Sequence, residues 1–294
     1  MQDHVPQDHG PDRGSPDHVS SDQAPSEADH RSRDRWPPER LPPEDRDEPR
    51  PGWRDGMPPR FMHQFGIATS LALSLVALVL GQAAGVCAVT AMGHSLTPPG
   101  ADDGAAAALF LIVSMPVQVI TLVLAARMTD ADLVSYLGFN LPTWREIEVA
   151  GAGLAILIVA GDVLTFLSGH DLVPAYDLGI HRTALAQGWL LALWFAIIVL
   201  LPVGEEMLLR SFLFRGFVRS STTSIPGLLS IALIWTLLHA QYDDQLANVL
   251  LFLVGSYLGI IRLVSGSTTL VILLHVLWNL ESILETVLAL GWVF

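Results

Sequence analysis

The chain is poor in charged residues and in cysteine. Of its 294 residues 15% are charged, and a single cysteine, Cys87, is present. One cysteine excludes a disulfide framework and a thiolate metal site. The sequence contains no stripe of basic residues and the formal net charge is −13, which argues against nucleic acid as a partner because binding along its phosphates needs clustered cations. A content of 51% hydrophobic residues argues further against an ordinary water-soluble enzyme.

The charges that do occur are concentrated at the N-terminus. Residues 1–60 hold 14 of the 29 acidic and 9 of the 16 basic residues, among proline and serine with almost no aliphatic side chains. Such a segment cannot bury enough apolar surface to offset the entropy lost on ordering the chain. We therefore expect a disordered, acidic and proline-rich tail, followed by a helical membrane domain of residues 61–294. The first apolar run begins only near Gly66, so no signal peptide is expected.

Seven apolar runs follow, most of them reaching the ~20 residues with which a helix crosses the hydrocarbon core. They predict an all-α polytopic membrane protein of seven to eight transmembrane helices, the eighth being a half-buried helix near 130–136 or 143–149. Arginines and aspartates alternate between successive loops, so we expect an integral protein of a bacterial plasma membrane with a cytoplasmic N-terminus. The runs are 66–92, 104–126, 149–167, 188–203, 225–238, 246–264 and 268–290.

The fourth run ends in charged residues that membrane spans rarely contain. The stretch PVGEEMLLRSFLFRG places Glu205, Glu206 and Arg210 directly after uncharged sequence. A charge near the bilayer centre costs about 2.5 to 3.5 kcal/mol, so such residues usually face a bundle interior and serve a function. On a helix Glu206 and Arg210 are i and i+4 and can pair, whereas Glu205 points about 100° away. The alternative interpretation is a helix-end salt bridge with one glutamate reaching the headgroups.

Two later runs contain histidine. His239 ends the fifth run, in IALIWTLLHAQY, and His275 precedes Asn279 by four residues in the seventh, in LLHVLWN. A turn centred near Thr222 would bring Glu205 and His239 level, because both lie 17 residues from it. His275 and Asn279 share a helix face by their spacing. The sequence therefore predicts that these side chains meet in one pocket.

This combination of side chains suits hydrolysis. A carboxylate or an imidazole can take a proton from water, and neutral donors can stabilise the oxyanion that develops on a carbonyl. The motifs contain no serine or cysteine, so we expect water to attack directly rather than through an acyl-enzyme.

In this order the motifs resemble those of the type II CAAX prenyl endopeptidases and their bacterial relatives, the CPBP or Abi proteins. The family pattern is Glu-Glu-x-x-x-Arg, then Phe-x-x-x-His, then His-x-x-x-Asn, on successive helices. Here Trp235 stands where phenylalanine is usual, and the resemblance covers residues 188–290. It implies an intramembrane endopeptidase that acts on a membrane-associated or lipidated peptide. The roles it implies are Glu205 and His239 for activating water, Glu206 and Arg210 for holding the first helix, and His275 and Asn279 for polarising the scissile carbonyl.

Three questions stay open at this stage. Zinc bound by Glu205, His239 and His275 is an alternative to a metal-free mechanism, although no His-Glu-x-x-His helix is present and the ligands would come from three spans. A non-enzymatic immunity or scaffold protein could keep the same polar cluster to fix helix packing. An ion or proton carrier could use Asp162, which lies within the third run.

Overall fold

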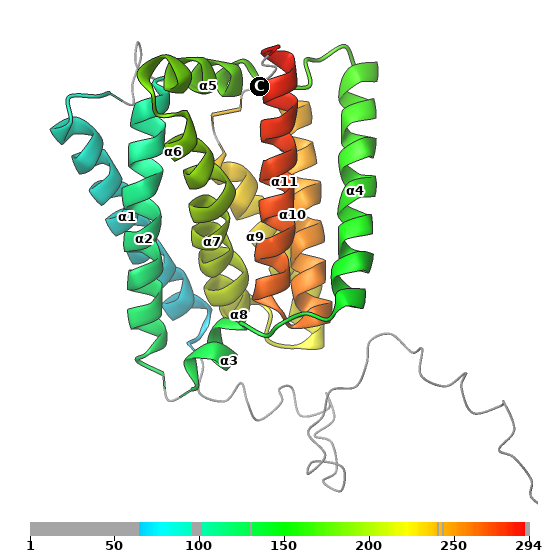
Figure 1. Ribbon diagram of the computed structural model, residues 1–294. Helices are drawn as coiled ribbons and strands as arrows, with labels where there is room; N and C mark the ends of the chain where they lie inside the picture. The colour runs from blue at the N-terminus through cyan, green and yellow to red at the C-terminus, as the bar shows by residue number, and fades with distance from the viewer. Residues whose placement is uncertain (1–64, 96–101, 130, 240, 243, 292–294) are drawn as a thin grey trace, which may run out of the picture. The chain divides into compact units, whose positions relative to one another are not determined.

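The computed structural model describes residues 65–95, 102–129, 131–239, 241–242 and 244–291. Regular structure in these ranges is helical and contains no strand, which confirms the all-α prediction; the expected tail, residues 1–60, lies outside them. Seven helical stretches are long and apolar enough to cross a membrane (Figure 1). They are α1 (Ile67–Ala91), α2 (Gly104–Ala126), α4 (Trp144–Leu167), the broken helix Leu190–Phe217, α9 (Ser221–Leu238), α10 (Gln245–Ser265) and α11 (Thr268–Ala289).

Two spans begin earlier than their apolar runs predicted. α4 starts at Trp144 because Thr143 and Glu146 form a capping box that satisfies the first backbone N–H groups. α9 starts at Ser221, where Ser220 and Thr223 form the corresponding box. An apolar run shows where a helix enters lipid, whereas the cap shows where its hydrogen bonding begins.

Two shorter helices lie at opposite ends of the bundle (Figure 1). α3 (Leu133–Leu137) is the additional helix expected near residues 130–136, whereas residues 143–149 belong to the start of α4. α5 (Ala175–Gln187) was not predicted. It packs against α2 and α6 (Leu190–Phe195), where Ile180 and Ala184 are buried. This helix lies beside the candidate site described below.

The distribution of polarity is that of a protein in lipid. Large apolar side chains are exposed on the outer helices, including Leu75 on α1 at 57% and Ile156 on α4 at 71%, while Glu206 and Arg210 are completely buried. Hydrocarbon offers no hydrogen bonds, so polar side chains have to find partners inside the bundle.

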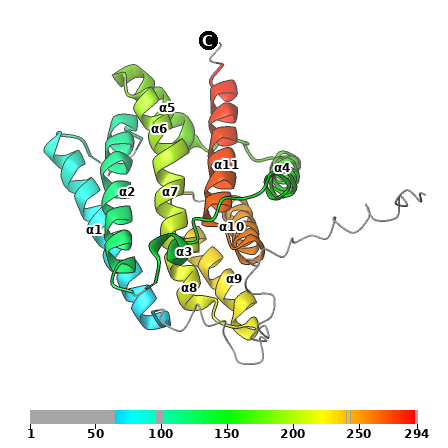
Figure 2. The ribbon, with the colours of Figure 1, turned by 60° about the horizontal axis from the view of Figure 1, so that its bottom comes forward.

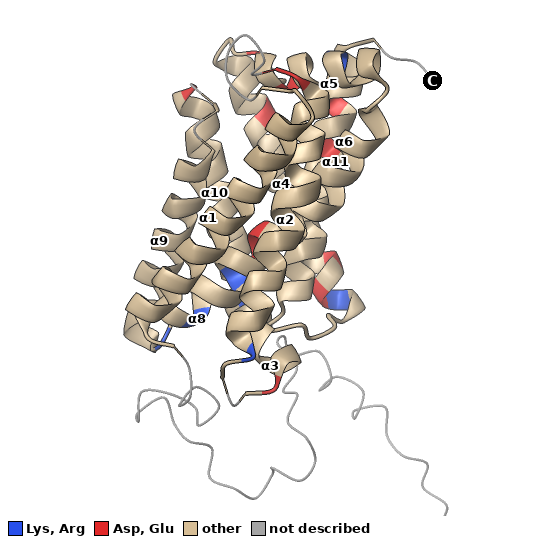
Figure 3. Ribbon diagram, turned by 90° about the vertical axis from the view of Figure 1, so that its left-hand side faces the viewer, with Lys and Arg blue, Asp and Glu red and all other residues tan. Residues whose placement is uncertain are grey.

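The charges of the loops separate the two ends of the bundle (Figure 3). The end that carries α3 and α8 (Phe214–Phe217) has arginines after α2, at the start of α4 and around the turn into α9. Aspartates dominate the opposite end, near α5. This is the alternation that the sequence indicated.

α9 and α10 pack closely against each other. A Cβ on Gly255 would lie 2.8 Å from Cε3 of Trp235, and one on Gly259 would lie 2.8 Å from Cγ of Leu228. Glycine at both positions therefore lets α9 pack directly on α10, which is the effect of small residues spaced four apart on a membrane helix. α4 packs on α10 and α11 at the edge of the bundle (Figure 2).

Candidate active site

The fourth span is irregular around the glutamate pair. It runs through α6, the π-helical η5 (Ala196–Leu200), α7 (Leu201–Glu206), the π-helical η6 (Met207–Leu213) and α8. Pro202 lacks the N–H that would bond to the turn before it, which accounts for the first irregularity. π-helical turns of this kind are frequent at functional sites because they redirect side chains and free backbone groups.

Glu206 and Arg210 form the ion pair that their spacing predicted. Arg210 Nη1 donates to Glu206 Oε1 at 2.9 Å, and both side chains are completely buried. Arg210 Nη2 also donates to the carbonyl oxygen of Gly255 at 3.1 Å, and Nδ1 of His275 lies 2.8 Å from Glu206 Oε1. The pair therefore ties the fourth span to α10 and α11, and it orients one of the two candidate imidazoles.

Glu205 points away from this pair and is 17% exposed. Its Oε2 accepts a hydrogen bond from Nε1 of Trp235 at 2.5 Å and lies 4.0 Å from Nε2 of His275. The adjacent glutamates thus have different environments, as the helical period requires. Glu206 is paired with Arg210 in the core, whereas Glu205 is partly exposed.

α2 supports the backbone just before Glu205. Gln118 Nε2 donates to the carbonyl oxygen of Gly204 at 2.9 Å. A Cβ on Gly204 would lie 2.5 Å from Sδ of Met115, so a larger residue would require the Met115 side chain to move. This close approach fixes the position of the glutamate backbone.

His239 ends α9 and presents one nitrogen to the cavity. Its Nδ1 lies 2.9 Å from the carbonyl oxygen of Trp235. A carbonyl can only accept, so Nδ1 carries the hydrogen and Nε2 is left with a lone pair. The ring is stacked on Tyr242, with centroids 6.2 Å apart and planes 8° apart, and packs edge-on against Trp235 at 4.9 Å. His239 is therefore placed to accept a proton.

The depth predicted for His239 was wrong by about one helical turn. The connection into α9 lies at residues 218–220, before Thr222, which belongs to the first turn of α9. Trp235 is consequently the residue that meets Glu205, and His239 lies one turn closer to the aspartate-rich end. The cap at Ser220, which hydrophobicity does not reveal, causes the shift.

Of the six site residues that the sequence predicts, four line one cavity of about 520 Å³. These four are Glu205, His239, His275 and Asn279. Within the described chain, Glu206 and Arg210 lie behind the wall of the cavity and do not line it. Asn279 Nδ2 donates to the carbonyl oxygen of Ile197 in η5 at 2.7 Å. One amide hydrogen is thus used on the backbone, which leaves the second N–H for a ligand.

α5 contributes cavity residues that sequence reasoning missed. Tyr242 donates its hydroxyl hydrogen to Asp177 Oδ2 at 3.3 Å, and both line the cavity. Burial raises the pKa of Asp177 to about 6, which the hydrogen bond from Tyr242 partly opposes. Burial also lowers the pKa of His181, one turn further along α5. Asp177 and His181 have i, i+4 spacing, which is compatible with one helix face, but the segment lacks the long apolar run by which the spans are predicted.

The donor set considered for zinc does not fit one ion in this arrangement. Tetrahedral zinc holds its ligand atoms at about 2.0 to 2.2 Å, so the three ligand atoms must lie close together. Among the described residues, the group whose ligand atoms all lie within 4.8 Å of one another is a different one. Glu205 Oε2 also accepts the hydrogen bond from Nε1 of Trp235.

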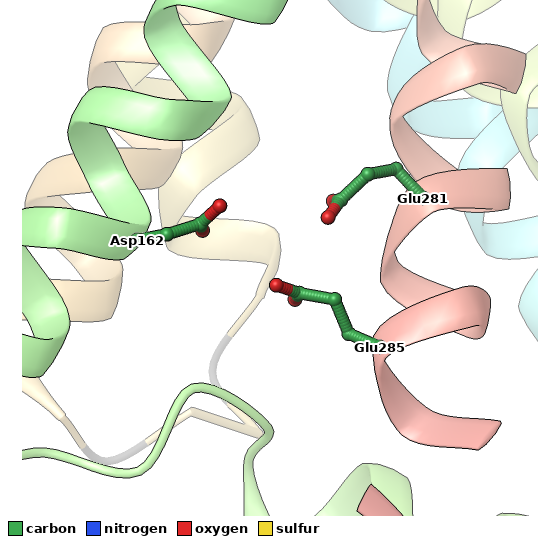
Figure 4. A group of neighbouring side chains, drawn as sticks. All are labelled: Asp162, Glu281 and Glu285. Atoms are coloured by element: carbon green, nitrogen blue, oxygen red, sulfur yellow. The ribbon is translucent and has the colours of Figure 1, made fainter. Parts of the chain in front are cut away.

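That other group consists of Asp162 on α4 with Glu281 and Glu285 on α11 (Figure 4). The glutamates are i and i+4, and all three side chains are half-buried. The sequence indicates Asp162 alone, because the contact with Glu281 and Glu285 joins two helices that are distant in the chain. Within the described chain, none of the three lines the cavity of Glu205, so this acidic cluster is separate from the candidate active site.

Comparison with known proteins places the similarity on the segment that carries the motifs. Residues 187–280 match the family model described as Type II CAAX prenyl endopeptidase Rce1-like, which confirms the resemblance over this segment. The chain is also similar to an "Uncharacterized 24.3 kDa protein" of Escherichia coli, with 36% identity over 80 residues, or 27% of this chain. It spans 37% of the length of that relative. No solved structure matches the chain. Seven apolar helices and this match together indicate an integral membrane protein in which residues 187–280 are similar to this family model.

Proposed function

We propose that the protein is an intramembrane endopeptidase that hydrolyses a membrane-associated peptide with water activated by Glu205 and His239. The observation that carries the proposal is the single cavity of about 520 Å³ that Glu205, His239, His275 and Asn279 share. A carboxylate, a proton-accepting imidazole and a carboxamide line one cavity inside an apolar bundle. Amide hydrolysis uses such groups to accept a proton from water and to stabilise the oxyanion.

The proposed chemistry begins with a water held between the carboxylate of Glu205 and Nε2 of His239. One of these groups takes a proton as the water oxygen attacks the scissile carbonyl, so a tetrahedral oxyanion forms. The same proton then passes to the leaving nitrogen as the C–N bond breaks, which releases an amine and a carboxylic acid. The indole N–H of Trp235 holds the glutamate carboxylate in place during both transfers.

His275 and Asn279 would stabilise the oxyanion. Nδ1 of His275 faces the carboxylate of Glu206, which can only accept, so Nδ1 donates and Nε2 faces the cavity. In this role His275 presents Nε2 to the oxyanion and donates a hydrogen bond to it when this nitrogen carries the hydrogen. Asn279 offers the N–H that the carbonyl of Ile197 leaves unused. Glu206 and Arg210 act through His275 as positioning residues.

The cavity extends to the aspartate-rich end of the bundle, where Asp103, Asp177 and Tyr242 line it. If arginine-rich loops are cytoplasmic, the N-terminus lies inside and the site is reached from the outer face of a plasma membrane. The expected substrate is a peptide that is held at that face by an apolar segment or a lipid. Membrane lipids surround the remaining helices.

The spacing of the donors supports a metal-free mechanism, and zinc is the alternative to it. Chelation of zinc from the purified protein should leave hydrolysis unchanged. Loss of hydrolysis on chelation, with recovery on adding zinc, would favour the metal-dependent alternative with Glu205, His239 and His275 as ligands.

Comparing membrane proteomes tests the function itself. Cells that carry the wild-type chain should contain peptide fragments that vanish in Glu205→Ala at equal levels of the membrane protein. If the fragments are identical and biological activity persists, the chain is a scaffold or immunity protein. The acidic cluster of Asp162 favours the carrier alternative, which ion flux into vesicles that depends on Asp162 but not on Glu205 would support.

A further inference from the structure

A second cavity lies at the arginine-rich end of the bundle. It has a volume of about 430 Å³ and lies between α3 and the loops beside it, α8, the start of α9 and the end of α10. Three arginines line it, Arg215, Arg219 and Arg262. In the part of the chain that the structure describes, its lining includes no aspartate or glutamate. The cavity is therefore strongly positive.

Arg262 is the most informative of these residues, because its side chain is only 6% exposed. Its Nε donates to the carbonyl oxygen of Arg210 at 3.0 Å, and its guanidinium carbon lies 5.3 Å from the centre of the Phe214 ring. Among the described residues it makes no ion pair with a carboxylate. Burying a charge without a counter-charge costs free energy. We therefore expect an anion to bind in the cavity that this guanidinium lines.

The other walls suit the headgroup region of a bilayer. Arg219 is half-buried at the rim, directly before the N-terminus of the 18-residue helix α9, whose dipole favours negative charge. Phe214, Val218 and Leu263 supply apolar surface beside the cations. Guanidinium groups bind phosphate oxygens in a bidentate manner, and basic pockets between transmembrane helices bind anionic headgroups.

We propose that this cavity binds the phosphate of an anionic phospholipid headgroup, with Arg262 at its base and Arg219 at its rim. The bound phosphate supplies the counter-charge that Arg262 lacks within the described chain. Because Arg262 also holds the Arg210 carbonyl, the lipid stabilises the turn of η6 that carries the partner of Glu206. The site is separate from the hydrolytic cavity, so lipid binding can be tested without any substrate.

Thermal unfolding of the full chain, purified in a neutral detergent, tests this proposal. Phosphatidylglycerol should raise the Tm, whereas phosphatidylcholine at the same concentration should not. Arg219→Gln should weaken the apparent affinity for phosphatidylglycerol about five-fold, which corresponds to the ~1 kcal/mol that one arginine contributes near an anionic surface. Arg127→Gln is the matched control, because Arg127 is exposed at the same end and does not line the cavity.

Three outcomes would overturn the proposal. Equal Tm shifts with the two lipids would show that the phosphate charge is not recognised. Equal loss of affinity in Arg219→Gln and Arg127→Gln would show that only the general charge of this end matters. A shift by inorganic phosphate equal to that by phosphatidylglycerol at equal concentration would assign the site to a free anion. None of these results depends on whether the protein is a protease.

Discussion

Nε1 of Trp235 donates a hydrogen bond to Oε2 of Glu205 across 2.5 Å, and this bond joins α9 to the break in the fourth span. The same indole ring lies between the two candidate imidazoles, 4.9 Å from the ring of His239 and 5.6 Å from that of His275. Phenylalanine, the residue usual at this position in the family pattern, has no such donor. In this chain the aromatic residue therefore also positions the proposed catalytic carboxylate.

Trp235→Phe tests that positioning role. The variant keeps the aromatic packing but loses the donor, so we expect a folded protein with kcat about ten-fold lower and KM nearly unchanged, because a misplaced base slows the chemical step. The measurement is steady-state hydrolysis together with thermal unfolding. Trp278→Phe is the control, since Trp278 also lines the cavity. Equal kinetics in the two variants would contradict the role assigned to the indole.

The buried pair of Glu206 and Arg210 should dominate the stability of the site. Glu206→Gln leaves the guanidinium without its carboxylate in a completely buried position, so we expect a loss of about 3 to 5 kcal/mol. The double variant Glu206→Gln with Arg210→Met removes both charges and should recover most of that loss. Thermal unfolding of the three proteins measures the difference. A double variant no more stable than the single one would show that the charge pair is not the cause.

Asp177 should make stability depend on pH. Its folded pKa of about 6 lies above the ordinary value of 3.8, so the folded state binds the proton more tightly than the unfolded state does. This contribution is fully present below about pH 4 and is lost as the pH rises through 6, by at most about 3 kcal/mol.

The comparison with Asp177→Asn isolates this contribution. The Tm of the wild-type protein should match that of the variant at pH 4 and fall below it at pH 7.5. Asp171→Asn, in the exposed loop before α5, serves as the control. Parallel pH profiles for the wild-type protein and Asp177→Asn would contradict the buried position of this carboxyl.

Cysteine labelling tests which end of the bundle faces the cytoplasm. In a Cys87→Ser background, Asp171→Cys should react with an impermeant maleimide on intact cells, because it lies at the end to which the cavity extends. Arg127→Cys, at the arginine-rich end, should react only after lysis. The reverse pattern would place the cavity on the cytoplasmic side and would change the class of substrate accordingly.

Hydrophobic runs predicted the fold because each span must cover a fixed thickness of hydrocarbon. The end of α2 at Ala126 was predicted correctly. The start of α4 was not, since the capping box of Thr143 and Glu146 extends it through polar sequence. α5 was missed for a related reason, because it lies at the end of the bundle and has no long apolar run.

The sequence predicted which residues line the cavity better than it predicted which of them touch. Helical spacing alone separated Glu206, which pairs with Arg210, from Glu205, which does not. The meeting of Glu205 with Trp235 depends on where the turn before α9 lies. The approach of Asp177 depends on how α5 folds across the end of the bundle. Both are tertiary contacts between distant segments, which the periodicity of a single helix does not report.

The most direct test of the account is cleavage of a membrane substrate, identified from the proteome comparison, by purified protein in liposomes. Glu205→Gln should lower the rate at least about 100-fold, as expected for loss of a general base, without changing the Tm. Glu285→Gln, which alters a half-buried glutamate outside the cavity, should retain the wild-type rate. Cleavage by Glu205→Gln at the wild-type rate would contradict the central claim that this carboxylate activates the water.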